Sequence, residues 1–185
     1  MSDQQRVVID TSTLVGVILR PDSVPRRAFM AAVRTCELCV SLETLDELRE
    51  VLQRPKFDRY TPLQARLEFW ALVRERSRLW ELDAQSEQAA ENACRDMKDG
   101  KFLALAQACQ AMALLTSDAD MLVLHPWHGV PILTPSAFLQ KMGGCERDQS
   151  MLILSVDKTP AFAYVCKHGR EAISKYIARI SEILS

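Results

Sequence analysis

The chain has 185 residues, of which 48% are hydrophobic and 25% charged, a composition typical of a globular protein with one main core. Its 23 basic and 24 acidic side chains give a formal net charge of −1, which excludes a strongly basic nucleic-acid coat protein. No apolar run approaches the ~20 residues of a membrane span, and the polar start does not resemble a signal peptide, so we expect a cytoplasmic protein without membrane contact.

The first half of the chain alternates short apolar runs with helical patterns. The expected elements are a strand over residues 6–9, helices over 14–19 and 26–34, a strand over 37–40, and helices over 42–54 and 63–76. Ser41 is expected to cap the helix over 42–54. The apolar face of the last helix is expected to contain Leu63, Leu67, Trp70, Leu72 and Val73.

The second half continues the same alternation. It predicts a strand over residues 79–82, helices over 85–94 and 101–111, strands over 113–116 and 130–133, and a helix from 135 to about 144. The helix over 101–111 is apolar nearly all round and should be buried. Strands that alternate with helices favour an α/β fold, with a parallel sheet covered by helices on both faces.

A boundary is expected near Gly143, which divides the chain into a main domain over 1–142 and a C-terminal appendage over 143–185. Two apolar runs, 151–156 and 161–166, flank a turn, and an amphipathic helical pattern follows them. We expect a small strand-turn-strand-helix appendage that serves assembly, so a homo-oligomer is expected.

Six cysteines lie in the chain, in a sequence that can build a core without disulfides, and reduced thiols are therefore expected. Cys36 and Cys39 have the spacing of metal ligands. No second pair of matching spacing completes a zinc site, so structural zinc is not expected.

Acidic side chains follow several of the expected strands or border the expected helices. They are Asp10, Glu47, Asp99 with Asp96 beside it, and Asp118. Each position alone is better explained by a structural role, such as capping a helix. Together the positions favour metal binding over separate structural roles, because a metal-dependent phosphodiesterase needs three or four carboxylates from different elements to hold Mg²⁺ or Mn²⁺. The four positions therefore predict one hard-cation site, the active centre of a nuclease.

Five ordered segments, spread over about residues 6 to 142, resemble the PIN-domain nucleases, and in particular the branch of bacterial toxins of the VapC type. The segments are residues 8–12 (VIDTS), 45–57 (LDELREVLQRPKF), 95–106 (RDMKDGKFLALA), 116–122 (TSDADML) and 132–139 (ILTPSAFL). The chain departs from the family pattern where Lys98 replaces an acidic residue of the third segment.

The resemblance implies a three-layer α/β/α sandwich with a parallel sheet of four or five strands. It also implies metal-dependent hydrolysis of single-stranded RNA and, for a toxin, an antitoxin protein as partner. The matching metal-binding and catalytic positions are Asp10, Glu47, Asp99 and Asp118. The matching outer-shell positions are Thr11, Ser12, Asp96, Thr116 and Asp120.

Two other functions compete with this interpretation. An aspartate-dependent phosphotransferase would use Asp10 as a nucleophile with a second acid two residues later, but Ser12 occupies that position. An inactive PIN-like module that acts only by binding a protein is the second alternative, and the complete acidic set argues against it.

Overall fold

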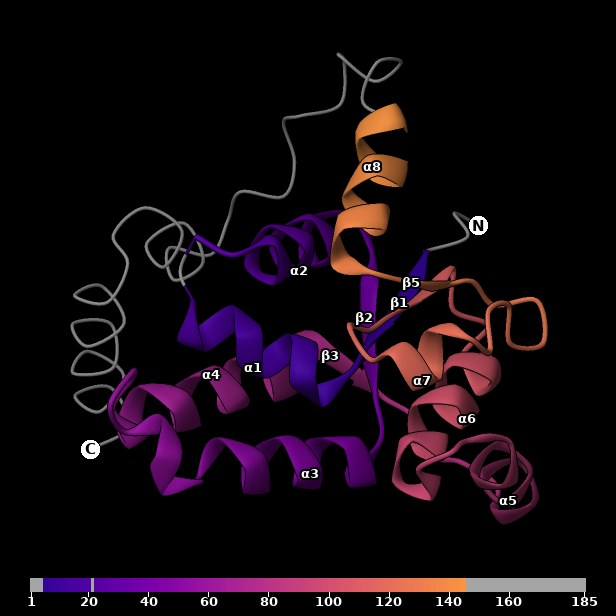
Figure 1. Cartoon of the computed structure of the whole chain (residues 1–185), viewed down its shortest axis with the longest axis horizontal. Helices are drawn as coiled ribbons and strands as arrows, with labels where there is room; N and C mark the ends of the chain where they lie inside the picture. Colours follow the sequence, from indigo (N-terminus) through magenta and orange to yellow (C-terminus); the bar gives the residue numbers. More distant parts are fainter. Residues whose placement is uncertain (1–4, 21, 146–185) are drawn as a thin grey trace. The chain divides into compact units, whose positions relative to one another are not determined.

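The structure, a computed structural model, describes residues 5–20 and 22–145. Five parallel strands form one sheet in the order β3-β2-β1-β4-β5. The strands are β1 (Arg6–Ile9), β2 (Glu37–Val40), β3 (Ser77–Leu79), β4 (Ala113–Leu115) and β5 (Ile132–Leu133). The α-helices are α1 (Thr11–Leu19), α2 (Val24–Thr35), α3 (Leu42–Leu52), α4 (Leu63–Arg76), α5 (Ala84–Ala93), α6 (Gly100–Ala108), α7 (Ala119–Leu122) and α8 (Pro135–Cys145), and two short 3-10 helices are η1 (Pro55–Phe57) and η2 (Met97–Asp99) (Figure 1).

Helices cover both faces of the sheet. Because successive residues of a strand point to opposite faces, one strand contributes side chains to the core on each side. Val7 and Ile9 of β1 join a core cluster with α1, α2, α3, α4 and α8. Val8, between them, joins a second cluster with α5, α6 and α7. This arrangement is the three-layer α/β fold with a parallel sheet that the sequence predicts (Figure 1). Of the expected C-terminal appendage, residues 143–145 belong to α8 and residues 146–185 lie outside the described residues.

α6 is the most buried helix of the second cluster. Its residues 102–106 are all between 0% and 2% exposed, as its unbroken apolar pattern predicts. The helix ends at Ala108, before the expected residue 111. Gln110 has φ 50°, in the left-handed region, and this conformation turns the chain out of the helix toward β4.

α4 differs from its expected apolar face. Leu63 is 44% exposed, whereas Arg66 and Phe69 are buried together with Val73. Arg66 can be buried because its Nη1 donates hydrogen bonds to the carbonyls of Leu52 and Arg54 and its Nη2 pairs with Asp58.

The third strand is also displaced from its expected position, residues 79–82. β3 ends at Leu79, and the amide of Trp80 donates the next sheet hydrogen bond to the carbonyl of Val40 over 2.8 Å. β3 is an edge strand with Leu79 51% exposed, so its apolar residues do not mark the paired segment.

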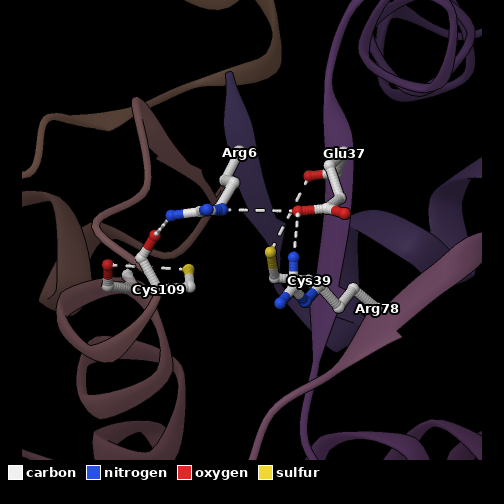
Figure 2. A network of polar contacts seen from close by, with 6 residues as sticks. Arg6, Glu37, Cys39, Arg78 and Cys109 are labelled. Atoms are coloured by element: carbon white, nitrogen blue, oxygen red, sulfur yellow. Dashed lines mark hydrogen bonds and ion pairs between the residues drawn. The ribbon is translucent and has the colours of Figure 1, made fainter. Parts of the chain in front are cut away.

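A polar network ties the amino ends of the strands together (Figure 2). Glu37 at the start of β2 accepts from Arg6 Nε over 3.3 Å and pairs with Arg78 of β3 over 3.6 Å. Arg6 also donates to the carbonyl of Cys109, just after α6, over 3.2 Å, and both arginines lie over the ring of Trp80. These contacts fix the edge of the sheet opposite the carboxyl ends of the strands.

Among the described residues, every helix is too short or too polar to span a membrane.

Candidate active site

The candidate site lies at the carboxyl edge of the sheet, where the strand order changes direction. β1 pairs with β2 on one side and with β4 on the other, and the chain reaches β4 only after β3. Asp10 directly follows β1, and Asp118 follows β4 after two intervening residues. In open parallel sheets, this point of reversal is where ligands bind. The topology therefore places two of the expected carboxylates where a ligand site forms.

Asp10 is held rigidly. It is 2% exposed, and its carboxylate accepts hydrogen bonds from Ser12 Oγ over 2.8 Å, from the Thr13 amide over 2.8 Å and from Thr116 Oγ1 over 2.7 Å. The bond from Thr13 caps α1, so Asp10 has both the structural role and the site position considered from the sequence. Burial raises the pKa of Asp10, and the hydrogen bonds from Thr13, Thr116 and Ser12 oppose that rise.

Asp99 links the acidic residues electrostatically. It ends η2 and stands at the N-cap of α6, but its side chain makes no capping hydrogen bond. Its pKa is raised to about 6, first by burial and then by the negative charges of Asp118, Asp96, Glu47 and Asp10, in that order. The negative charges of the other three carboxylates expected from the sequence therefore all act on Asp99.

Glu47 lies on α3 and forms an ion pair with Lys101 in the first turn of α6. Both side chains are mostly buried, at 29% and 19% exposure. Lys101 is not among the site residues expected from the sequence. Its position two residues after Asp99 is the only signal in the sequence that could have suggested it. Lys101 supplies a positive charge to the acidic cluster and joins α3 to α6.

The expected outer-shell residues divide into two groups. Ser12 and Thr116 contact Asp10 directly, and Thr116 Oγ1 also accepts from the Asp118 amide over 2.9 Å. Asp96 and Asp120 have other partners. Asp96 accepts from the Lys98 amide over 3.0 Å and caps η2, while Asp120 lies 3.4 Å from Arg95.

Thr11, the remaining outer-shell residue, does not contact Asp10 through its side chain. Its hydroxyl is buried, and within the described residues it has no hydrogen-bond partner. A buried hydroxyl of this kind normally finds a partner, protein or water. The Thr11 hydroxyl, one residue after Asp10, is thus a buried polar group whose hydrogen-bonding capacity no described residue satisfies.

The carboxylate oxygens of the cluster are ligands that a hard cation prefers. The Asp99 carboxylate makes no capping hydrogen bond at the start of α6, so it is free of that structural role. Within residues 5–20 and 22–145, however, no three His, Cys, Asp or Glu side chains are placed so that they could hold one metal ion as they stand. Glu47 pairs with Lys101, and Asp118 accepts from the Asp120 amide over 2.8 Å. Glu47 therefore already has a cationic partner in the structure.

Cys94 is affected by the acidic residues, because burial and then the negative charges of Asp99 and Asp96 raise the pKa of its thiol to about 11. His125 Nδ1 accepts from the Ile132 amide over 2.9 Å, which ties the loop before β5 to that strand. Cys36, Cys39, Cys94 and Cys109 are free thiols.

Comparison with known proteins identifies the family. The PIN-domain profile matches residues 6–120, more than half of the chain. The chain therefore belongs to the PIN-domain family, a family of nucleases, as its sequence motifs predict. None of the curated proteins compared with the chain matches it.

The chain resembles several solved structures at low sequence identity. The structure of PAE2754 from Pyrobaculum aerophilum superposes with a TM-score of 0.57 at 13% identity and covers 78% of this chain and 99% of its own. VapBC2 from Rickettsia felis, bound to a DNA fragment from its promoter, gives a TM-score of 0.51 at 13% identity and covers 70% of this chain and 98% of the other. FitAcB from Neisseria gonorrhoeae gives 0.49 at 19% identity, covering 70% and 98%.

Proposed function

We propose that the protein is a metal-dependent endoribonuclease that hydrolyses phosphodiester bonds of single-stranded RNA. One observation carries the proposal: burial and then the charges of carboxylates from four separate segments raise the pKa of Asp99 at the point where the strand order reverses. Such a concentration of negative charge is costly for a protein without a compensating cation, and it is typical of sites that bind Mg²⁺ or Mn²⁺.

In this proposal Asp10, Glu47, Asp99 and Asp118 hold the cation. When bound, the cation polarises a phosphoryl oxygen and lowers the pKa of an attacking water. Ser12 and Thr116 fix the orientation of the Asp10 carboxylate, and burial keeps bulk water away from it. Lys101 holds Glu47 in place and offsets part of the negative charge while the site has no cation.

The test is cleavage of labelled single-stranded RNA by purified protein, with and without Mg²⁺ or Mn²⁺. Asp10→Asn preserves the shape and the capping oxygen but removes the charge. The matched control is Asp46→Asn, which makes the same chemical change at an exposed position of α3 next to Glu47. We expect cleavage only with metal, loss of cleavage in Asp10→Asn and retention in Asp46→Asn. Equal rates for wild type and Asp10→Asn would refute the site.

The biological role we propose is that of a toxin in a toxin-antitoxin pair, supported by the family and by the five sequence segments of the VapC type. Expression of the wild-type chain should arrest growth of a bacterial host, and expression of Asp10→Asn should not. Arrest by both forms at equal expression would contradict a toxic nuclease activity and would point to toxicity through binding alone.

One observation favours the second candidate, an inactive PIN-like module that acts through a protein partner. Glu47 is already paired with Lys101, and no group of three side chains in the described ranges is ready to hold a metal. A metal titration separates the two functions. Saturable binding of Mn²⁺ that Asp99→Asn weakens supports the nuclease, and absence of binding supports the module.

A further inference from the structure

A basic loop joins α3 to α4, and we define the basic loop as residues 53–61. It contains three cations, Arg54, Lys56 and Arg59, and all three are exposed. Tyr60 follows them and is 48% exposed, one of the few large hydrophobic side chains on the described surface that solvent reaches. The loop thus presents positive charge and an aromatic ring together.

The acidic residue within the basic loop does not neutralise these cations. Asp58 pairs with the guanidinium of Arg66, which is fully buried on α4 beneath the loop. The same guanidinium donates to two carbonyls, of Leu52 and Arg54, at the end of α3. Among the described residues, neither Arg54, Lys56 nor Arg59 forms an ion pair with a carboxylate. Arg66 therefore fixes the shape of the loop and leaves three positive charges uncompensated.

Two of the three cations lie over aromatic rings of the same loop. Lys56 Nζ is 5.0 Å from the centre of the Phe57 ring, and the guanidinium of Arg59 is 4.6 Å from the centre of the Tyr60 ring. Such contacts restrict the long side chains and reduce the entropy that a ligand must remove on binding. A cation stacked beside an exposed ring is a surface that suits a phosphate and its neighbouring base.

The basic loop also has a defined place relative to the carboxylate site. The basic loop begins directly after α3, whose last residue, Leu52, follows Glu47 by five residues, or about 7.5 Å along the helix at ~1.5 Å per residue. Thr61 Oγ1 donates to the carbonyl of Ile18 over 3.5 Å, which attaches the loop to the last turn of α1, the helix that Asp10 caps. Two helices thus connect the loop to the site.

We propose that the basic loop binds the backbone of single-stranded RNA, with Arg54, Lys56 and Arg59 on phosphates and Tyr60 against a base. The proposal rests on the nuclease function proposed above and names a substrate-binding surface at the carboxyl ends of α1 and α3, about 12 Å from Asp10 along α1 at ~1.5 Å per residue. RNA is favoured over an acidic protein segment because the loop combines phosphate-binding charge with an exposed ring, and every base has a face on which such a ring can stack.

Binding should be measured by fluorescence anisotropy, with a short labelled single-stranded RNA and the full chain carrying Asp10→Asn, in EDTA so that no cleavage occurs. The triple variant Arg54→Ala, Lys56→Ala, Arg59→Ala should bind more weakly. Its log–log dependence of affinity on salt should be shallower by about 2, at ~0.7 for each phosphate contact removed. Arg34→Ala is the matched control, because Arg34 is an exposed arginine at the end of α2, near the amino edge of the sheet. It should change neither quantity.

Tyr60 provides an independent test. Tyr60→Ala should weaken binding by about fivefold or more, the low end for one base stacked on an aromatic ring, and Tyr60→Phe should retain affinity. Circular dichroism melting of each variant checks the fold. If the triple variant is unfolded, the single variants Lys56→Gln and Arg59→Gln replace it, each with an expected slope change of about 0.7.

The outcomes distinguish failure of the basic loop from failure of the proposed function. If wild type cleaves RNA but the loop variants bind as Arg34→Ala does, the loop proposal is overturned and the nuclease function stands. If wild type neither binds nor cleaves RNA, both are overturned. If the loop variants leave RNA binding intact and lower the mass seen in sedimentation, the loop is an interface between protein chains, and the RNA-binding role is wrong.

Discussion

Asp10 has two roles that substitution can separate, since its carboxylate caps α1 and belongs to the acidic cluster. Asparagine caps helices about as well as aspartate, whereas alanine costs about 1 kcal/mol. We expect the unfolding midpoint of Asp10→Asn to lie at the same denaturant concentration as that of the wild type or higher, because asparagine caps α1 without burying a charge. Asp10→Ala should unfold at a lower concentration, and both variants should lose cleavage. Chemical unfolding followed by circular dichroism checks this. A less stable Asp10→Asn would show that the charge itself stabilises the fold.

Asp99 makes the stability of the metal-free protein depend on pH. Its pKa rises from 3.8 to about 6 on folding, so between these values the native state binds more protons than the unfolded state. The contribution of Asp99 to stability is therefore present below 3.8 and is lost as pH rises through about 6. We expect this decline in unfolding experiments at several pH values, and we expect Asp99→Asn to remove much of it. A wild-type stability that rises over this range, with no change in Asp99→Asn, would contradict the clustered arrangement.

In the proposed metal site, Lys101 would compete with the cation for Glu47, with which it forms an ion pair. In Lys101→Met, Glu47 is free and the acidic cluster loses a positive charge, so the metal-free protein should melt at a lower temperature. Saturating Mn²⁺ should then raise the melting temperature more than in the wild type, since a ligand stabilises the state that it binds. Lys98→Met is the control, because Lys98 is exposed and has no ion pair with a described carboxylate. A smaller rise in Lys101→Met would instead assign Lys101 a role in assembling the metal-bound site.

At the scale of the elements, Gly100 allows α5 to approach the beginning of α6. A Cβ at Gly100 would lie 2.6 Å from both the amide nitrogen and the Cα of Glu91, and backbone atoms cannot move aside as a flexible side chain can. Gly100→Ala should therefore destabilise the fold by about 1–3 kcal/mol, the usual range for overpacking. It should also reduce cleavage, because Asp99 adjoins the displaced backbone.

The control for Gly100 lies on α8. A Cβ at Gly143 meets no atom within 4 Å, so Gly143→Ala should be neutral or stabilising by up to about 1 kcal/mol through helix propensity. Unfolding in urea compares the two variants. Equal stabilities would show that α5 is not tightly packed on α6.

The sequence predicts the elements whose pattern records their burial. β1, β2 and β4 are buried apolar runs and were located to within a residue, and α6 is apolar on all sides and was expected to be buried. β3 and the buried face of α4 were misplaced, because an edge strand and a buried arginine follow no apolar period. Of the candidate site, only Asp10 and Asp118 could be predicted from strand ends, since Glu47 lies within α3 and Asp99 at the start of α6. The pairing of Glu47 with Lys101 could not be predicted, because it depends on how α3 approaches α6.

At the scale of the whole molecule, α8 completes the described core. Phe138 is fully buried, and Leu139 and Met142 pack against the cluster that contains β1. A protein that ends at Cys145 should therefore keep this helix. We propose that residues beyond it serve assembly, so the truncated protein should retain metal-dependent cleavage and should contain fewer subunits than the full chain in sedimentation. A truncated protein that keeps the same number of subunits and loses cleavage would place those residues at the active site.

The capping roles of Asp10 and Asp118 have a consequence for descent. Each begins a helix, α1 or α7, so selection for folding alone would retain both in a lineage that no longer cleaves RNA. Asp99 makes no capping hydrogen bond, and Glu47 contributes only a partly exposed ion pair, so neither is protected in this way. Homologous chains that have drifted away from catalysis should therefore keep aspartate or asparagine at the first two positions while varying at the other two. A comparison of homologous sequences at the positions of Glu47 and Asp99 would therefore separate active nucleases from inactive homologues.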